Sequence, residues 1–161
     1  MIIGKGDIAK ILNDRKEVIF FASGVSNSNE TNESEYEREK KLLSIQDKTK
    51  CIFYFSSISV DDINKHSRYI KHKIEMEEII KSNFQNYNII RIGNIIWGNN
   101  PNTFINFINN KVKNYEPVVI KDEFKYIINK EELLLLTDNL PLTGKNIISV
   151  FSKMAKVKDL L

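Results

Sequence analysis

The sequence has only one cysteine, Cys51, and two histidines. A single cysteine excludes an intrachain disulfide and any zinc cluster built on several thiolates, and it favours a reducing compartment. Neither His66 nor His72 belongs to a group of cysteine and acidic residues with the spacing of a metal site. We therefore predict that the chain binds no metal and that both histidines lie on the surface.

Long apolar runs and a dominant charge of one sign are also absent. The longest apolar runs, such as Val18–Ala22 and Leu133–Leu136, are far shorter than the ~20 residues of a membrane-spanning helix. The 24 Lys and Arg residues against 21 Asp and Glu residues give a net charge of +3, without the basic face that nucleic acid requires. We expect no membrane and no nucleic-acid partner and, because no secretory signal is recognisable, a cytoplasmic location.

The composition is that of a folded protein, with 42% hydrophobic and 28% charged residues and only three prolines. The length of 161 residues suits one hydrophobic core. We therefore expect a single domain over residues 1–161.

Short apolar runs alternate with segments of helical periodicity, which is typical of an α/β domain with a mainly parallel sheet. The runs predict strands at Met1–Ile3, Val18–Ala22, Cys51–Phe55, Tyr87–Ile92, Pro117–Ile120, Lys125–Ile128 and Lys145–Val150. The periodic segments predict a helix shortly after Gly6 and further helices at Ser34–Ile45, Ser67–Lys81, Asn102–Val112, Glu131–Asn139 and Ser152–Leu161. In such a fold a ligand crevice forms at the carboxyl ends of the strands.

A glycine-rich motif follows the first predicted strand. Gly4, Gly6 and Ala9 fit G-x-G-x-x-A at the start of a helix, where the glycines permit a tight turn and a close approach of backbone N–H groups to a pyrophosphate. Lys5 adds a positive charge nearby. The alternative is a plain glycine turn between strand and helix, and the acidic residue that usually binds the adenosine ribose is missing after Ala22.

A second motif is the pair Tyr69 and Lys73, spaced Y-x-x-x-K. One turn of helix separates the two side chains, and a nearby ammonium favours phenolate, so that a tyrosine can exchange a proton with a substrate oxygen. The same spacing occurs at Tyr36/Lys40 and Tyr126/Lys130. Tyr69 stands out because its helix follows a strand that ends in paired serines, and Ser57 can bond the same substrate oxygen.

Two other interpretations of these residues remain open. Tyr69 can be a half-buried packing residue and Lys73 a solvated one. A serine hydrolase based on Ser57 is a marginal alternative, because the serine lacks the G-x-S-x-G elbow and no oriented acid can be named.

The order of these segments resembles a known family. The chain reads, in succession, G-K-G-D-I-A, V-I-F-F-A-S-G, C-I-F-Y-F-S-S-I-S-V, S-R-Y-I-K-H-K-I-E-M-E-E and N-I-I-R-I-G-N-I-I-W-G. This succession is similar to the extended short-chain dehydrogenase/reductase family, the NAD-dependent epimerases and dehydratases that act on nucleotide sugars. The resemblance covers residues 1 to 110 well and the rest faintly.

The resemblance implies a catalytic role for three residues. Ser57 would supply the hydroxyl if Val60 aligns with the family's valine, whereas a shift of one residue would put Ile58 there and lose the hydroxyl. Tyr69 would act as the acid/base. Lys73 would lower the pKa of Tyr69 and bond the nicotinamide ribose.

The resemblance also implies a cofactor site. Gly4, Lys5, Gly6 and Ala9 would hold the pyrophosphate, Ala22 and Ser23 would line the cofactor, and Asn94 would lie beside the nicotinamide and the bound sugar nucleotide. The interval from Gly6 to Val18 is much shorter than in the family, so the second and third family strands are expected to be missing, and with them the adenosine site.

These features together predict a compact Rossmann-like three-layer sandwich with a mainly parallel sheet. The implied function is that of an NAD(P)-dependent epimerase/dehydratase-like oxidoreductase acting on a nucleotide-activated sugar, with NAD or NADP weakly bound or lost. The alternative is a non-catalytic nucleotide- or sugar-nucleotide-binding or assembly module. Because the strand at Met1–Ile3 would form an exposed sheet edge, we also expect a homodimer, through this edge or through the helices at Ser34–Ile45 and Ser67–Lys81.

Overall fold

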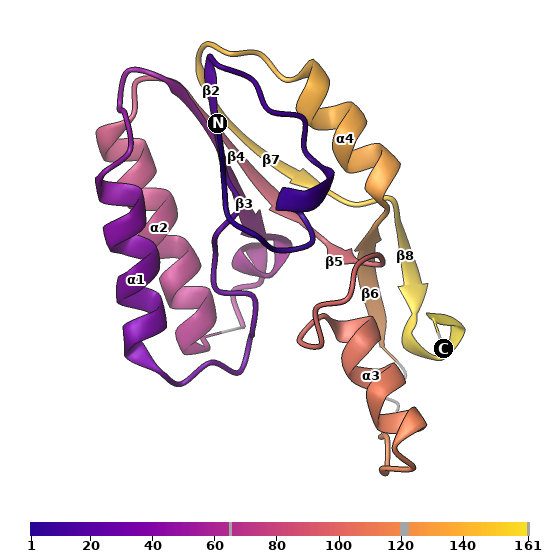
Figure 1. The fold of residues 1–161 in the computed structure, drawn as a ribbon. Coiled ribbons are helices and arrows are strands. Elements are labelled where there is room, and N and C mark those ends of the chain that lie inside the picture. Colours follow the sequence, from indigo (N-terminus) through magenta and orange to yellow (C-terminus); the bar gives the residue numbers. More distant parts are fainter. Residues whose placement is uncertain (65, 120–122, 161) are drawn as a thin grey trace.

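A parallel sheet of five strands forms the centre of the computed structural model, which describes residues 1–64, 66–119 and 123–160 (Figure 1). The strands lie in the order β1 (Ile2–Ile3), β2 (Val18–Phe21), β3 (Cys51–Ser57), β4 (Tyr87–Ile92) and β7 (Lys145–Val150). Each neighbouring pair is parallel. As predicted, β1 pairs with β2 and forms one edge of the sheet, because the chain between them adds no further strand.

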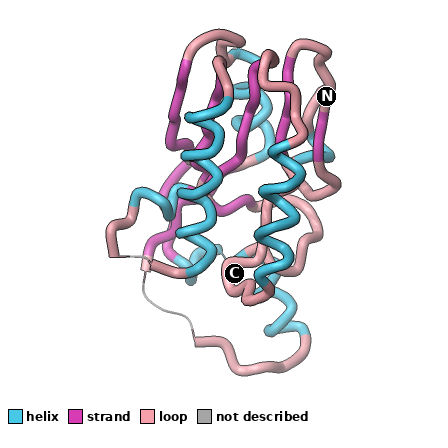
Figure 2. Tube along the Cα trace, turned by 90° about the vertical axis from the view of Figure 1, so that its left-hand side faces the viewer, coloured by secondary structure: helices cyan, strands magenta, loops and turns pink. Residues whose placement is uncertain are grey.

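Helical segments cover both faces of this sheet. Helices α1 (Glu33–Ser44) and α2 (Arg68–Asn83) pack on one face and lie in front of the strands in Figure 2. The other face is covered by α4 (Lys130–Asn139) and by the segment that contains the 3₁₀ turn η1 (Ala9–Ile11). The predicted three-layer α/β fold is therefore confirmed.

The core has two halves, one on each side of the sheet. Strand side chains alternate between them, and the central strands read as continuous apolar runs because both faces are buried. The half beneath α1 and α2 contains Ile19, Phe21, Leu43, Ile52, Tyr54, Met76, Ile80, Phe84, Tyr87 and Ile89. The opposite half contains Leu12, Val18, Phe20, Cys51, Phe53, Phe55, Ile90, Ile92, Ile128 and Leu133.

A second, three-stranded sheet lies beside the carboxyl ends of these strands (Figure 1). It consists of β5 (Asn94–Ile95), β6 (Phe124–Ile128) and β8 (Lys153–Lys156), with β6 and β8 antiparallel. Helix α3 (Phe104–Lys113) lies next to it. Two short 3₁₀ turns, η2 (Ile58–Asp61) and η3 (Val157–Leu160), complete the described elements.

Three predicted elements were wrong. The segment Ser152–Leu161 is not a helix: residues 153–156 pair with β6 as β8, and η3 follows, because an available strand edge outweighs a weak helical periodicity. Residues 117–119 form no strand, while Ile120 and Leu161 lie outside the described residues. The helix expected after Gly6 is only the single turn η1.

Candidate functional site

A cleft of about 1590 Å³ opens at the carboxyl ends of β1 to β4, between the two sheets. Its walls come from the segments that follow these strands, from the first turns of α2, and from α3 and β6. Eight residues predicted from the sequence as site residues line it: Lys5, Gly6, Ala22, Ser23, Ser57, Tyr69, Lys73 and Asn94. The tertiary structure thus gathers most of the predicted site in one place.

Gly4 and Ala9 are not part of the cleft lining. Gly4 has a φ of +128°, and a Cβ there would lie 2.3 Å from the carbonyl oxygen of Ala22, so the glycine is required for the turn itself. Ala9 is buried within η1. Because η1 is only one 3₁₀ turn, the expected contribution of a helix N-terminus to anion binding is missing, and backbone N–H groups of the turn alone remain.

The glycine turn is tied to the loop that follows β5. The Asp7 carboxylate is buried and accepts a hydrogen bond from the Asn100 backbone N–H at 2.9 Å. The Trp97 indole N–H donates to the carbonyl oxygen of Asp7 at 3.3 Å. Gly98, with a φ of +85°, leaves the space that the Asp7 side chain fills. These contacts fix the loop between β5 and α3 against the first turn of the chain.

Ser57 and Tyr69 bring two hydroxyl groups to the cleft. Ser57 ends β3, and its Oγ accepts a hydrogen bond from the Ser59 backbone N–H at 3.2 Å, which leaves its own proton available. Tyr69 lies in the first turn of α2, whose N-cap is Ser67. Among the described residues, the Tyr69 hydroxyl makes no hydrogen bond, so both groups remain free to contact a ligand.

The neighbouring serine has a different role. Ser56 Oγ donates to Glu77 at 2.7 Å, and Glu77 in turn holds the Arg91 guanidinium at 2.6 and 3.0 Å. Arg91 also pairs with Asp61, which accepts a hydrogen bond from Ser149. This network ties α2 to β3 and β4 and leaves Ser57 as the serine whose hydroxyl is not held by a neighbouring side chain.

Lys73 is buried at the wall of the cleft, with only 3% of its surface exposed, so the interpretation of Lys73 as a solvated residue is wrong. Its ammonium donates to the Tyr54 hydroxyl at 3.2 Å and lies 3.7 Å from the Glu39 carboxylate. The same ammonium is 5.7 Å from the centre of the Tyr69 ring. At Gly24 a Cβ would lie 2.6 Å from Lys73 Nζ, so the missing side chain makes room for the charge.

Glu39 is the carboxylate behind this lysine, and it is fully buried. Burial alone would raise the pKa of Glu39, but the charge of Lys73, the hydrogen bond from His72 and the backbone N–H of Val25 outweigh it and lower that pKa to about 2. Burial, with the added charge of Glu39, also raises the pKa of the Tyr54 hydroxyl well above its usual range.

His72 was predicted to lie on the surface, and this was wrong. Its Nε2 lies 2.8 Å from Glu39 Oε2, its side chain is fully buried, and its ring packs against Tyr36. The sequence signal that was missed is the helical spacing of Tyr36, Glu39 and Leu43, which puts a glutamate in the buried stripe of α1.

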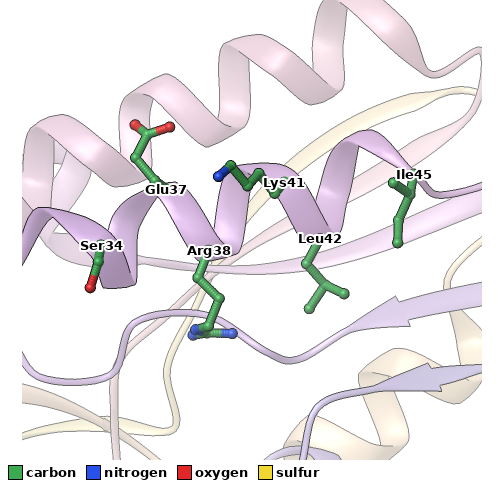
Figure 3. A pocket seen from close by; sticks show the side chains of 6 residues that line it. All are labelled: Ser34, Glu37, Arg38, Lys41, Leu42 and Ile45. Atoms are coloured by element: carbon green, nitrogen blue, oxygen red, sulfur yellow. The ribbon is translucent and has the colours of Figure 1, made fainter.

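Arg38 is a further cleft residue that the sequence did not single out. Its guanidinium donates to Ser23 Oγ at 3.2 Å and to the Ser23 carbonyl oxygen at 3.3 Å. Arg38 also lines a separate shallow hollow of about 630 Å³ on α1, where it points to the same side of the helix as Leu42 while Glu37 points to the other (Figure 3). Arg38 therefore places a cation at the Ser23 end of the cleft.

The residues present suit one half of a nicotinamide dinucleotide. Lys5 and Arg38 offer cations for a pyrophosphate, and a Cβ at Gly6 would meet no atom within 4 Å, so open space lies over the turn. Hydroxyl, ammonium and amide groups for a nicotinamide riboside come from Ser57, Tyr69, Lys73 and Asn94.

The adenosine half has no counterpart in the described residues. Because β1 is the sheet edge, no strand lies where an acidic ribose-binding residue would be placed, and η1 is the only regular element between β1 and β2. The donor set therefore fits the reactive half of the cofactor and not the half that usually supplies much of the affinity.

No protein-family model and no curated protein matches the chain. Solved structures do match. A UDP-N-acetylglucosamine 4-epimerase from Methanobrevibacter ruminantium, in complex with UDP-N-acetylmuramic acid, is 19% identical and aligns over 96% of this chain and 61% of its own, with a TM-score of 0.62.

Two further matches are complexes with the cofactor. The enzyme WbmH from Bordetella bronchiseptica, in complex with NAD⁺, is 9% identical over 89% of this chain and 55% of its own, with a TM-score of 0.64. UDP-glucose 4-epimerase from Thermus thermophilus, in complex with NAD, is 12% identical over 89% and 59%, with a TM-score of 0.61. The chain spans little more than half the length of these proteins. The resemblance to the extended short-chain dehydrogenase/reductase family is confirmed at the level of the fold.

Within the described ranges no helix is long and apolar enough to cross a bilayer. The same residues contain no group of three or more His, Cys, Asp or Glu side chains that could hold a metal ion.

Proposed function

We propose that the chain is an NAD(P)-dependent oxidoreductase of the epimerase/dehydratase kind, which acts on a nucleotide-activated sugar in the cytoplasm. The observation that carries this proposal is the single cleft that Ser57, Tyr69 and Lys73 line together, to which they bring two hydroxyl groups and a buried ammonium. The structural neighbours support it, because they include an enzyme in complex with NAD⁺ and a 4-epimerase in complex with a UDP-sugar.

In this proposal each side chain has a distinct task. Tyr69 takes a proton from a sugar hydroxyl, or returns one to a carbonyl oxygen, and Ser57 donates a hydrogen bond to the same oxygen. Lys73 places its positive charge 5.7 Å from the centre of the Tyr69 ring, where it stabilises negative charge that develops on the reacting oxygen atoms. The nicotinamide group supplies hydride transfer when it is bound.

The test is turnover of a panel of UDP-, dTDP- and GDP-sugars with NAD⁺ or NADP⁺. Tyr69→Phe should lower turnover by about 10²-fold or more, the usual contribution of a positioned acid/base. Tyr87→Phe is the matched control, because Tyr87 lies at the amino end of β4, at the other end of the sheet from the cleft. An active wild type that is unaffected by Tyr69→Phe would contradict the proposal.

A non-catalytic binding or assembly module is the second candidate. The sheet edge at β1 and the missing adenosine region favour it. A chain that binds nucleotide sugars in calorimetry, but binds no NAD(H) and turns over no sugar in the panel, would support this candidate instead.

A further inference from the structure

Lys73 is a buried charged side chain, and its charge needs a partner within the fold. An ammonium that is 3% exposed destabilises the folded chain unless a counter-charge accompanies it. Among the described residues, the carboxylate paired with Lys73 is Glu39, at 3.7 Å. Glu39 comes from α1 and Lys73 from α2, so the pair joins the two helices that cover one face of the sheet.

Glu39 is itself held from several sides. Its Oε2 accepts a hydrogen bond from the Val25 backbone N–H at 2.9 Å and lies 2.8 Å from His72 Nε2. Its Oε1 accepts from the Tyr54 hydroxyl at 3.1 Å and faces Lys73. A carboxylate with these partners cannot turn away from the lysine without leaving buried donors unpaired.

The cluster is built around one ion pair, Glu39 and Lys73. His72 contacts the Glu39 carboxylate through Nε2 at 2.8 Å, while its buried Nδ1 has no partner among the described residues. The Tyr54 hydroxyl lies between the two charged groups, because it accepts from Lys73 and donates to Glu39.

Only the lysine end of this pair reaches the cleft. Lys73 is part of the cleft lining, beneath the Tyr69 ring and in the space left by Gly24, whereas Glu39 lies behind it. Glu39 therefore reaches a ligand only through the groups that it holds, which are the Lys73 ammonium and the backbone of Val25 at the wall of the cleft.

We infer that Glu39 is a positioning residue, which keeps Lys73 protonated and directed at the cleft although that lysine is buried. The geometry of the buried pair supports this role, and the benefit to catalysis rests on the proposed function. The proposed reaction then requires a residue of α1, which lies outside the Y-x-x-x-K motif and outside the strand that carries Ser57.

The experiment measures the acetylation of Lys73 by acetic anhydride as a function of pH, with the labelled peptide quantified by mass spectrometry. In Glu39→Gln the midpoint for labelling of Lys73 should fall by about one pH unit or more, because burial then favours the uncharged amine. Glu39→Asp retains the carboxylate and should return the midpoint toward that of the wild type.

Glu77→Gln is the matched control. Glu77 is equally buried and equally paired, but its partners are Arg91 and Ser56. This variant should lose stability as Glu39→Gln does and yet leave the labelling midpoint of Lys73 unchanged. An unchanged midpoint in Glu39→Gln, or an equal shift in Glu77→Gln, would overturn the inference.

A double variant keeps the inference testable if Glu39→Gln does not fold. Adding Lys73→Met removes the other charge, so the double variant should fold and be more stable than Glu39→Gln alone. Failure of the double variant to fold would show that Glu39 is needed for a reason other than Lys73. Because labelling requires no turnover, an inactive wild type would count against the proposed function and leave this result unaffected.

Discussion

Acid should remove the stabilisation that Glu39 contributes to the fold. The pKa of this carboxyl group is about 2 in the folded chain against an ordinary value of 4.5, a difference of about 2.5 units. At about 1.4 kcal/mol per unit this corresponds to roughly 3 kcal/mol of stability. Since the folded-state pKa is the lower one, the stabilisation is fully present above pH 4.5 and is lost as the pH falls through about 2.

The measurement compares the wild type with Glu39→Gln in urea unfolding, followed by far-UV circular dichroism, from neutral pH to about pH 2. The wild type should lose about 3 kcal/mol more of its free energy of unfolding than the variant over this range. Other carboxylates with lowered pKa values, such as Glu33 and Glu75, are present in both proteins and cancel in the comparison. Equal losses in the two proteins would refute the assignment of Glu39 as a charged, stabilising group.

Three further predictions concern the turn, the cofactor and the sheet edge. Gly4→Ala should lower the free energy of unfolding in urea by several kcal/mol, because its Cβ would lie 2.3 Å from a carbonyl oxygen at a φ of +128°. Gly6→Ala should lower it far less, because no atom lies within 4 Å of its Cβ. Similar unfolding midpoints for the two variants would contradict this prediction. The isolated chain should bind NAD(H) only in the high micromolar range or more weakly, because losing the ribose-binding acid and the adenine wall removes roughly two orders of magnitude or more of affinity; submicromolar binding in calorimetry would contradict it. The exposed edge at β1 should support a homodimer, and a chain that sediments as a monomer at high micromolar concentration would count against it.

The strands of the large sheet were predictable because both of their faces are buried. Runs such as Val18–Ala22 and Cys51–Phe55 are short apolar stretches bounded by polar residues. Such a stretch is typical of a strand in the middle of a parallel sheet. The connection after Gly6 is too short to hold further strands, so the edge position of the first strand was also predictable. In such a fold the chain order also brings Ser57, Tyr69 and Asn94 to one end of the sheet.

The second sheet was not predictable in the same way. Strands β5 and β8 are short, and their pairing depends on the edges of β6, which lies far away along the chain. No local periodicity in residues 153–156 distinguishes a strand from the helix that was expected.

The order of the main strands, the glycine turn and the placement of a tyrosine and a lysine one helical turn apart could be predicted, because these features depend on near neighbours in the chain. The surroundings of that lysine could not be predicted, because they depend on how distant segments pack. Packing α1 against α2 buried Glu39, His72 and Lys73 together beside Tyr54. Burial removed the water that would otherwise solvate each charge, so the groups had to satisfy one another.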